Sequence, residues 1–79
     1  MDSIAQLVVK LDIRDRGDVF SVRSDQVPGL HCYSSTMELL HATVLRAVPV
    51  LLHANRGLVG VQARLVKHDE LLVTFAAVN

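Results

Sequence analysis

The chain has 79 residues, enough for one small domain but too few for a second hydrophobic core. Eight basic residues balance eight acidic ones, so the net charge predicts no attraction to a polyanion and no direct binding of nucleic acid. Hydrophobic residues make up 51% of the chain before its four glycines are counted. Hydrophobic residues and glycine together make up only about 45 to 50% of an ordinary soluble domain. This excess predicts a homodimer or a permanent partner, because one small domain cannot bury it alone.

The start of the chain lacks the pattern of a secretory signal, because Asp2 stands where basic residues are expected and Lys10 and Asp12 interrupt the apolar residues. No uninterrupted apolar run approaches the length of about 18 residues that indicates a membrane span. The single Cys32 rules out an internal disulfide and fits a reducing compartment. We therefore expect one domain over residues 1–79, located in the cytoplasm and without membrane contact.

Two strands are predicted at the beginning of the chain. Apolar residues fall mainly on alternate positions over residues 3–14 and again over residues 19–24. Gly17 lies in the polar turn between them, where it can adopt a positive φ. The two segments are therefore expected to pair as a hairpin.

A short third strand is predicted over residues 30–33. Pro28 and Gly29 precede it and fit the two central positions of a type II turn. Alternation places Leu30 and Cys32 on the inner side of this strand, and His31 and Tyr33 on the outer side.

One long helix is predicted between residues 35 and 57. Ser35 and Glu38 have the spacing of a capping box, in which each side chain bonds the backbone amide of the other residue. Gly57 is suited to end the helix in a left-handed conformation, and Pro49 is expected to kink it. Steps of three and four residues align one apolar stripe, which consists of Met37, Leu40, Val44, Val48, Leu51 and Leu52.

Two more strands are predicted after the helix, over residues 58–66 and 71–78. The first alternates, whereas the second is apolar on both faces, which favours a subunit contact by edge pairing or face packing. A central strand buried within the monomer is the other interpretation of such a run. The predicted fold class is α+β, with the order β-β-β-α-β-β. A single five-stranded, mostly antiparallel sheet is covered on one face by one long kinked helix, and the strand over residues 58–66 lies parallel to the first strand and beside it.

No catalytic, cofactor-binding or metal-binding set is predicted. The four histidines and Cys32 show no zinc-ligand spacing, and an inward Cys32 is expected to be an inert core thiol. Asp12, Asp15 and Asp18 cluster around the first turn, where solvated turn residues are the simpler interpretation than a Mg²⁺ site.

Residues for partner binding are predicted on two surfaces. Arg23, His31 and Tyr33 share the outer face of the early strands, and Leu72, Thr74 and Ala76 lie on the last strand. A small ligand-binding domain or an enzyme that uses the outer sheet face is the alternative to a protein-interaction domain. An ordinary exposed polar face is the simpler interpretation of Arg23, His31 and Tyr33. RNA binding is a third hypothesis, which the absence of salt-dependent association would exclude.

A pairing of two short motifs points to a known family. Asp25 and the sequence Val27-Pro28-Gly29-Leu30 follow the second strand, and Thr36 and Glu38 then open the helix. The helix closes with a Leu-Leu pair, an asparagine and a glycine, at Leu51, Leu52, Asn55 and Gly57. In these residues the chain resembles the HicB-like antitoxin family, particularly its short stand-alone members.

The resemblance covers about residues 4–57 and implies a partial RNase H-like fold without nuclease activity. It also implies a non-enzymatic domain that binds and neutralises a small RNA-cleaving toxin of the HicA type. The residues that carry the motif, Asp25, Pro28, Gly29, Leu30, Ser35, Thr36, Glu38, Pro49 and Gly57, are expected to have structural roles.

Overall fold

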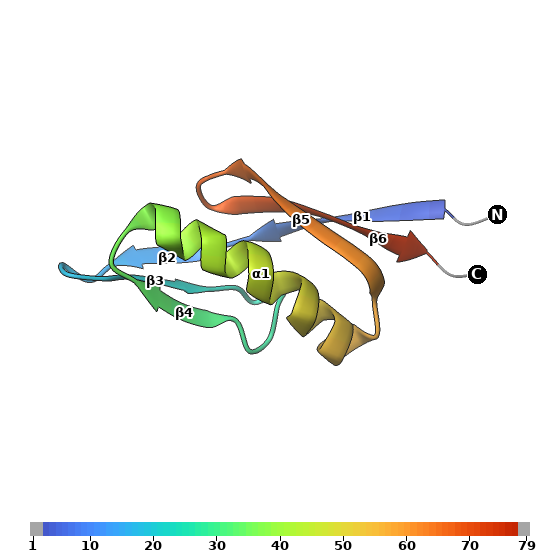
Figure 1. Ribbon diagram of the computed structural model, residues 1–79, viewed down its shortest axis with the longest axis horizontal. Helices are drawn as coiled ribbons and strands as arrows, with labels where there is room; N and C mark the ends of the chain where they lie inside the picture. Colours follow the sequence, from blue (N-terminus) through green and yellow to red (C-terminus); the bar gives the residue numbers. More distant parts are fainter. Residues whose placement is uncertain (1–2, 78–79) are drawn as a thin grey trace.

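The computed structural model describes residues 3–77, which form six strands and one helix (Figure 1). The first four strands are short or medium in length and precede the only helix in these residues. Their order and bounds are β1 (Ser3–Lys10), β2 (Asp12–Asp15), β3 (Phe20–Arg23), β4 (His31–Ser34), α1 (Met37–Arg56), β5 (Val59–Lys67) and β6 (Glu70–Ala77). The predicted end of the last strand, at Val78, lies outside the described residues.

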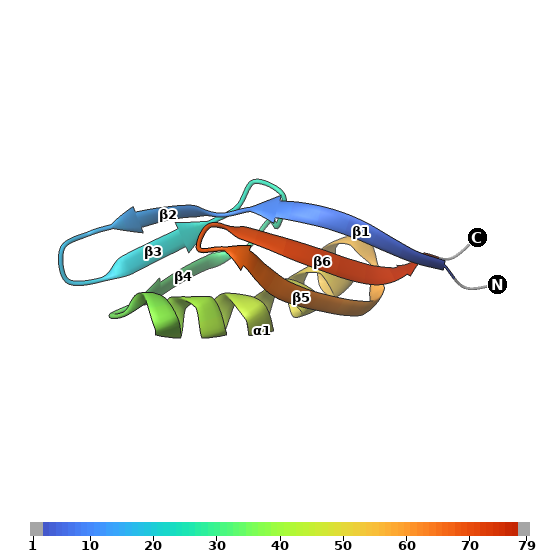
Figure 2. The same cartoon turned by 90° about the horizontal axis from the view of Figure 1, so that it is seen from above.

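The strands form two three-stranded antiparallel sheets, in the orders β1-β6-β5 and β2-β3-β4. The predicted fold class was therefore wrong in its single five-stranded sheet. The segment expected as one strand over residues 3–14 is divided at Leu11, so that β1 pairs with β6 while β2 pairs with β3 (Figure 2). Because β3 has only four residues, it can form backbone hydrogen bonds with only the end of this long segment. Its remaining backbone groups require another partner, which β6 supplies.

The position of β5 also differs from the prediction. It was expected to lie parallel to the first strand and beside it, but β6 lies between β1 and β5 and pairs with both in antiparallel orientation. The β5–β6 hairpin is closed by a tight turn at His68 and Asp69, where Lys67 pairs with Glu70. The hairpin is compatible with either arrangement, and β6, which is apolar on both faces and has no exposed residue, occupies the central position between β1 and the more exposed β5.

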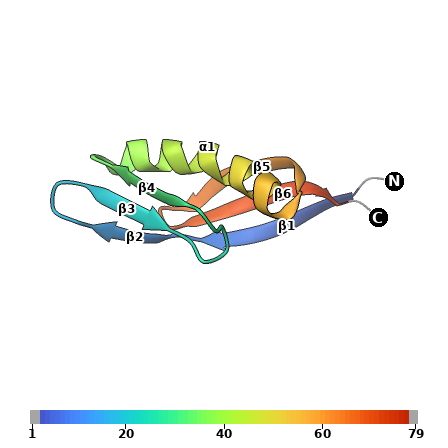
Figure 3. The same cartoon turned by 90° about the horizontal axis from the view of Figure 1, so that it is seen from below.

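The helix α1 packs its apolar stripe against both sheets (Figure 3). Four of the predicted stripe residues, Leu40, Val44, Val48 and Leu52, are completely buried, and Met37 and Leu51 pack around them. The sheets contribute Val9, Val22, Leu71 and Val73 to the core. Leu11, between β1 and β2, and Val27 and Leu30, in the loop before β4, are also buried there. The helix has a length and composition that could cross a membrane, and in this fold one stripe of its apolar residues, Leu40, Val44, Val48 and Leu52, is buried in the core.

The ends of α1 confirm one predicted cap and correct the other. Gly57 has a φ of +66° and its amide donates to the carbonyl of His53, as predicted for the C-terminus. At the N-terminus the cap is Thr36 rather than Ser35, because the Thr36 hydroxyl accepts from the amide of Leu39 at 3.2 Å. The predicted capping box is therefore wrong, since a cap at Thr36 places Leu39, which has no side-chain acceptor, at the position of the reciprocal partner. Pro49 lies within a single helix, as expected.

The loop between β3 and β4 forms the predicted turn, and it also bonds the edge of β1. The amide of Leu30 donates to the carbonyl of Val27 at 3.1 Å, and Gly29 has a φ of +89°, as a type II turn requires. The side chain of Gln26 bonds the outer edge of β1, accepting from the Lys10 amide at 2.7 Å and donating to the Val8 carbonyl at 2.6 Å. Gln26 thus replaces part of the strand partner that β1 lacks on this edge.

Candidate functional site

The strongest candidate site is the solvent-facing side of the β2–β3–β4 sheet. Alternation along the N-terminal segment directs Val9, Leu11 and Ile13 toward the core, and leaves Lys10, Asp12 and Arg14 exposed. Cross-strand pairing then aligns two rows on the outer face, which are Asp12–Arg23–His31 and Arg14–Ser21–Tyr33. Charged and aromatic side chains from three strands therefore meet on one surface.

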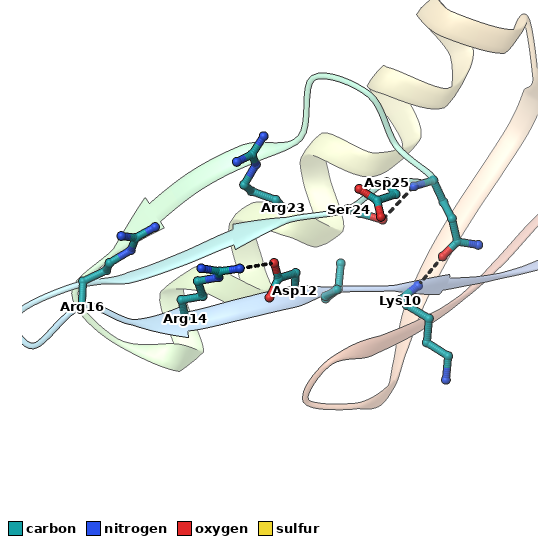
Figure 4. A pocket seen from close by; sticks show the side chains of 9 residues that line it. Lys10, Asp12, Arg14, Arg16, Arg23, Ser24 and Asp25 are labelled. Carbon is teal, nitrogen blue, oxygen red and sulfur yellow. Dashed lines mark hydrogen bonds and ion pairs between the residues drawn. The ribbon is translucent and has the colours of Figure 1, made fainter.

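This surface is hollowed into an open cavity of about 730 Å³, which we call the basic cavity (Figure 4). It is formed by the end of β1, by β2 and β3, and by the loop that follows β3. The charged side chains that line it are the cations Lys10, Arg14, Arg16 and Arg23 and the carboxylates Asp12 and Asp25. Half of the eight basic residues of the chain therefore line this one cavity.

Each cation of the basic cavity is held differently. Arg14 forms an ion pair with Asp12 at 3.4 Å, and Arg16 donates from Nε to the hydroxyl of the buried Ser21 at 3.3 Å. Within residues 3–77, Arg23 makes no ion pair, although Asp12 is its cross-strand neighbour. The Arg23 guanidinium is thus the cation most available to a ligand.

Lys10 is directed away from the other cations toward β6. Its ammonium group donates a hydrogen bond to the Glu70 carboxylate and forms an ion pair with it, and this bond, with the attraction of the same carboxylate, raises the pKa of Lys10 above its ordinary value. The Lys10 side chain is 69% exposed, so this pair contributes little to stability.

An aromatic pair borders the basic cavity on β4. The rings of His31 and Tyr33 lie with their centroids 4.9 Å apart at an interplanar angle of 45°, and Tyr33 is 56% exposed. Of the residues predicted for partner binding, Arg23, His31 and Tyr33 are therefore brought together here. Lys10, Arg14 and Arg16 were not predicted as site residues. Lys10 and Arg14 occupy alternate positions with the apolar residues of the first segment, and this alternation indicated that both side chains are exposed.

The other predicted partner-binding residues lie on a second surface. Leu72, Thr74 and Ala76 belong to β6, which is flanked by β1 and β5, so the predicted edge pairing of this strand is not available. Their outer face remains open: Ile4, the cross-strand neighbour of Ala76, is 76% exposed, and Val8, the neighbour of Leu72, is 43% exposed. We call the set Ile4, Val8, Leu72 and Ala76 the outer apolar face.

The residues that carry the family resemblance mostly build the connection between the turn and the helix. Asn55 near the end of α1 donates to the carbonyl of Pro28 at 2.7 Å. A Cβ atom on Gly29 would lie 3.3 Å from Cδ2 of Leu51, so the turn contacts the helix closely at this point. Leu30 is buried in the core, while Asp25 lines the basic cavity.

The described residues do not group the histidines, Cys32 and carboxylates into a metal site; no cluster of three or more such side chains occurs within residues 3–77. His41 donates from Nε2 to the carbonyl of His68 at 2.7 Å, and His53 bonds the carbonyl of Leu58 through Nδ1 at 2.8 Å. These two rings connect α1 to the β5–β6 hairpin and to the start of β5. Cys32 is half-buried against the core.

No protein-family model, curated protein or solved structure matches this chain.

Proposed function

We propose that this protein is a non-enzymatic interaction domain of the antitoxin type, which binds and neutralises a small RNA-cleaving toxin. The observation that carries this proposal is the outer apolar face, whose side chains have no covering element in the described part of the chain. The resemblance of residues 24–57 to the HicB-like family supports the choice of partner. The hydrogen bond from Asn55 to Pro28 supports the assignment of that motif to the scaffold that holds the helix on the sheets.

The outer apolar face has the composition of a small protein interface. Two rows that contain its apolar residues, Ile4–Ala76 and Val8–Leu72, flank a central polar row formed by Gln6, Thr74 and Gln62. The exposed Arg64 of β5 is the cross-strand neighbour of Leu72. The apolar side chains of the two flanking rows provide the binding energy, and the central polar groups provide orientation. Because β6 is central, a partner packs onto the face of the sheet and does not extend it as another strand.

A second copy of the chain is proposed to cover the same face when the toxin is absent. The sequence is richer in apolar residues than a small monomer needs, and Ile4 and Val8 are among its exposed large hydrophobic residues. Homodimer formation would remove these side chains from water, and binding of the toxin would then replace the second copy.

Co-expression with the product of the adjacent reading frame, followed by affinity purification and an RNA-cleavage assay, tests the proposal. The wild-type chain is expected to recover the partner and suppress cleavage, whereas Ile4→Arg is expected to lose the complex, because it places a charge in the contact. Val50→Arg is the matched control, since Val50 is 67% exposed on α1. Failure to recover a partner, or equal loss with both variants, would reject the proposal.

Sedimentation equilibrium tests the homodimer separately. The mass of the wild-type chain is expected to be twice 8.7 kDa, and Ile4→Arg is expected to be monomeric. A wild-type chain that is monomeric at all accessible concentrations would reject the homodimer while leaving toxin binding to be judged by the first experiment.

A further inference from the structure

We propose that the outer face of the β2–β3–β4 sheet binds single-stranded nucleic acid, with phosphates at Arg14, Arg16 and Arg23 and a base on Tyr33. The inference is independent of the proposed toxin binding, because it uses the other sheet. It rests on the juxtaposition of the basic cavity with the aromatic pair, across three neighbouring strands.

The local charge of this face differs from the net charge of the chain. Three arginines line the basic cavity against the two carboxylates Asp12 and Asp25, whereas the whole chain is neutral; the fourth cation, Lys10, is paired with Glu70 and is not counted. Screening at physiological salt limits electrostatic interactions to about 8 Å, so a bound phosphate responds to the local group rather than to the total charge. The expectation of no nucleic-acid binding, which was drawn from the net charge, therefore does not apply to this face.

Two of the arginines are oriented before any ligand binds. The bond from Arg16 to the buried Ser21 hydroxyl and the ion pair of Arg14 with Asp12 restrict both side chains. Arg23 lies on the strand between them and β4, and it makes no ion pair among the described residues. The strand register places Arg14 and Arg23 on the same face of the sheet, and Arg16 bonds Ser21 on that face; Figure 4 shows the three side chains around the cavity. Planar guanidinium groups can bond phosphate oxygens with two donors each.

Tyr33 adds to this charged face an exposed aromatic ring on which a base can stack. It is 56% exposed on β4 and is the cross-strand neighbour of Ser21, which in turn is the neighbour of Arg14. Neighbouring strands lie about 4.8 Å apart, so the ring is about 10 Å from β2. An aromatic side chain at the border of a cationic surface stacks on an unpaired base, and this favours a single strand over a duplex, whose bases are already stacked.

Fluorescence anisotropy with a labelled ten-nucleotide oligouridylate, and with a blunt duplex of the same length, tests the proposal at 50 mM salt. The single strand is expected to bind at least tenfold more tightly than the duplex. Contact with about three phosphates predicts a slope near −2 for log K against log salt, since each phosphate on a single strand contributes about −0.7.

Variants separate the two components of the site. Arg14→Ala combined with Arg23→Ala is expected to weaken binding at least tenfold, and Tyr33→Ala is expected to weaken it about tenfold while Tyr33→Phe retains it. Arg46→Ala combined with Arg56→Ala is the matched control, because it removes the same charge from exposed positions on α1 and should change binding less than twofold. Circular dichroism and urea unfolding of every variant establish that the fold is intact.

Several outcomes would overturn the inference. Absence of binding at 50 mM salt would do so, and so would equal losses from the two arginine pairs. Binding that is unchanged in folded Tyr33→Ala would reject the base-stacking role. Full displacement of the oligonucleotide by an equal concentration of polyglutamate would identify the face as a site for acidic peptides instead.

Discussion

Gly29 and Gly17 both have a left-handed backbone, but only Gly29 lies against another element. Their φ values are +89° and +99°, and a Cβ atom would approach Leu51 at Gly29 but would meet nothing within 4 Å at Gly17. We expect Gly17→Ala to lower the free energy of unfolding by about 1 to 2 kcal/mol, the cost of a left-handed alanine. Gly29→Ala should cost about 1 kcal/mol more, because it also crowds Leu51. Urea denaturation measures both values, and equal losses would show that Leu51 moves away at no cost.

The sequence predicts Ser35 as the N-cap of α1, whereas in the structure the N-cap is Thr36. The Thr36 hydroxyl accepts from the Leu39 amide at 3.2 Å, while Ser35 precedes the cap. Thr36→Ala is therefore expected to lower the free energy of unfolding by about 1 kcal/mol. Ser35→Ala should change it by less than about 0.5 kcal/mol, as for an ordinary surface position. The opposite order in thermal or urea unfolding would restore the capping box predicted from the sequence.

At the scale of elements, Gln26 connects the loop after β3 to the free edge of β1. Its side chain makes two hydrogen bonds with this edge, to Val8 and to Lys10. Gln26→Ala is expected to lower the free energy of unfolding by about 1 to 3 kcal/mol, from two bonds of about 0.5 to 1.5 kcal/mol each. Hydrogen exchange of the Lys10 amide should become faster in proportion. Gln6→Ala, on the exposed outer face of β1, is the control, and an equal loss there would contradict the role of Gln26.

At the scale of the whole molecule, both sheets depend on the same helix. The structure is elongated, with extents of 48 × 22 × 17 Å, and α1 contacts β3 and β4 in one sheet and β5 in the other. Leu52 is completely buried in this shared core, so Leu52→Ala is expected to cost about 2 to 5 kcal/mol. Amide exchange should accelerate in both sheets together. Val50→Ala, at a 67% exposed position of α1, is the control. Acceleration confined to one sheet would show that the sheets unfold separately.

The sequence by itself determined the elements whose signals are local. The buried stripe of α1, its end at Gly57 and the turn at Pro28 and Gly29 follow from the spacing of apolar residues and from the backbone preferences of proline and glycine. The solvent exposure of His31 and Tyr33 follows from the period of a strand. The same alternation predicts that Lys10 and Arg14 are exposed, although it could not show that Arg14 and Arg23 line one cavity.

Only the tertiary structure decided which strands pair and which charges meet. Alternation is identical along residues 3–14 whether the segment has one partner or two, so the change of partner at Leu11 leaves no mark in the pattern. The apolar character of β6 on both faces likewise does not distinguish an edge strand from a central one. Pairing of backbone groups across the sheets resolved both questions, because it depends on which distant segments can satisfy the same hydrogen bonds.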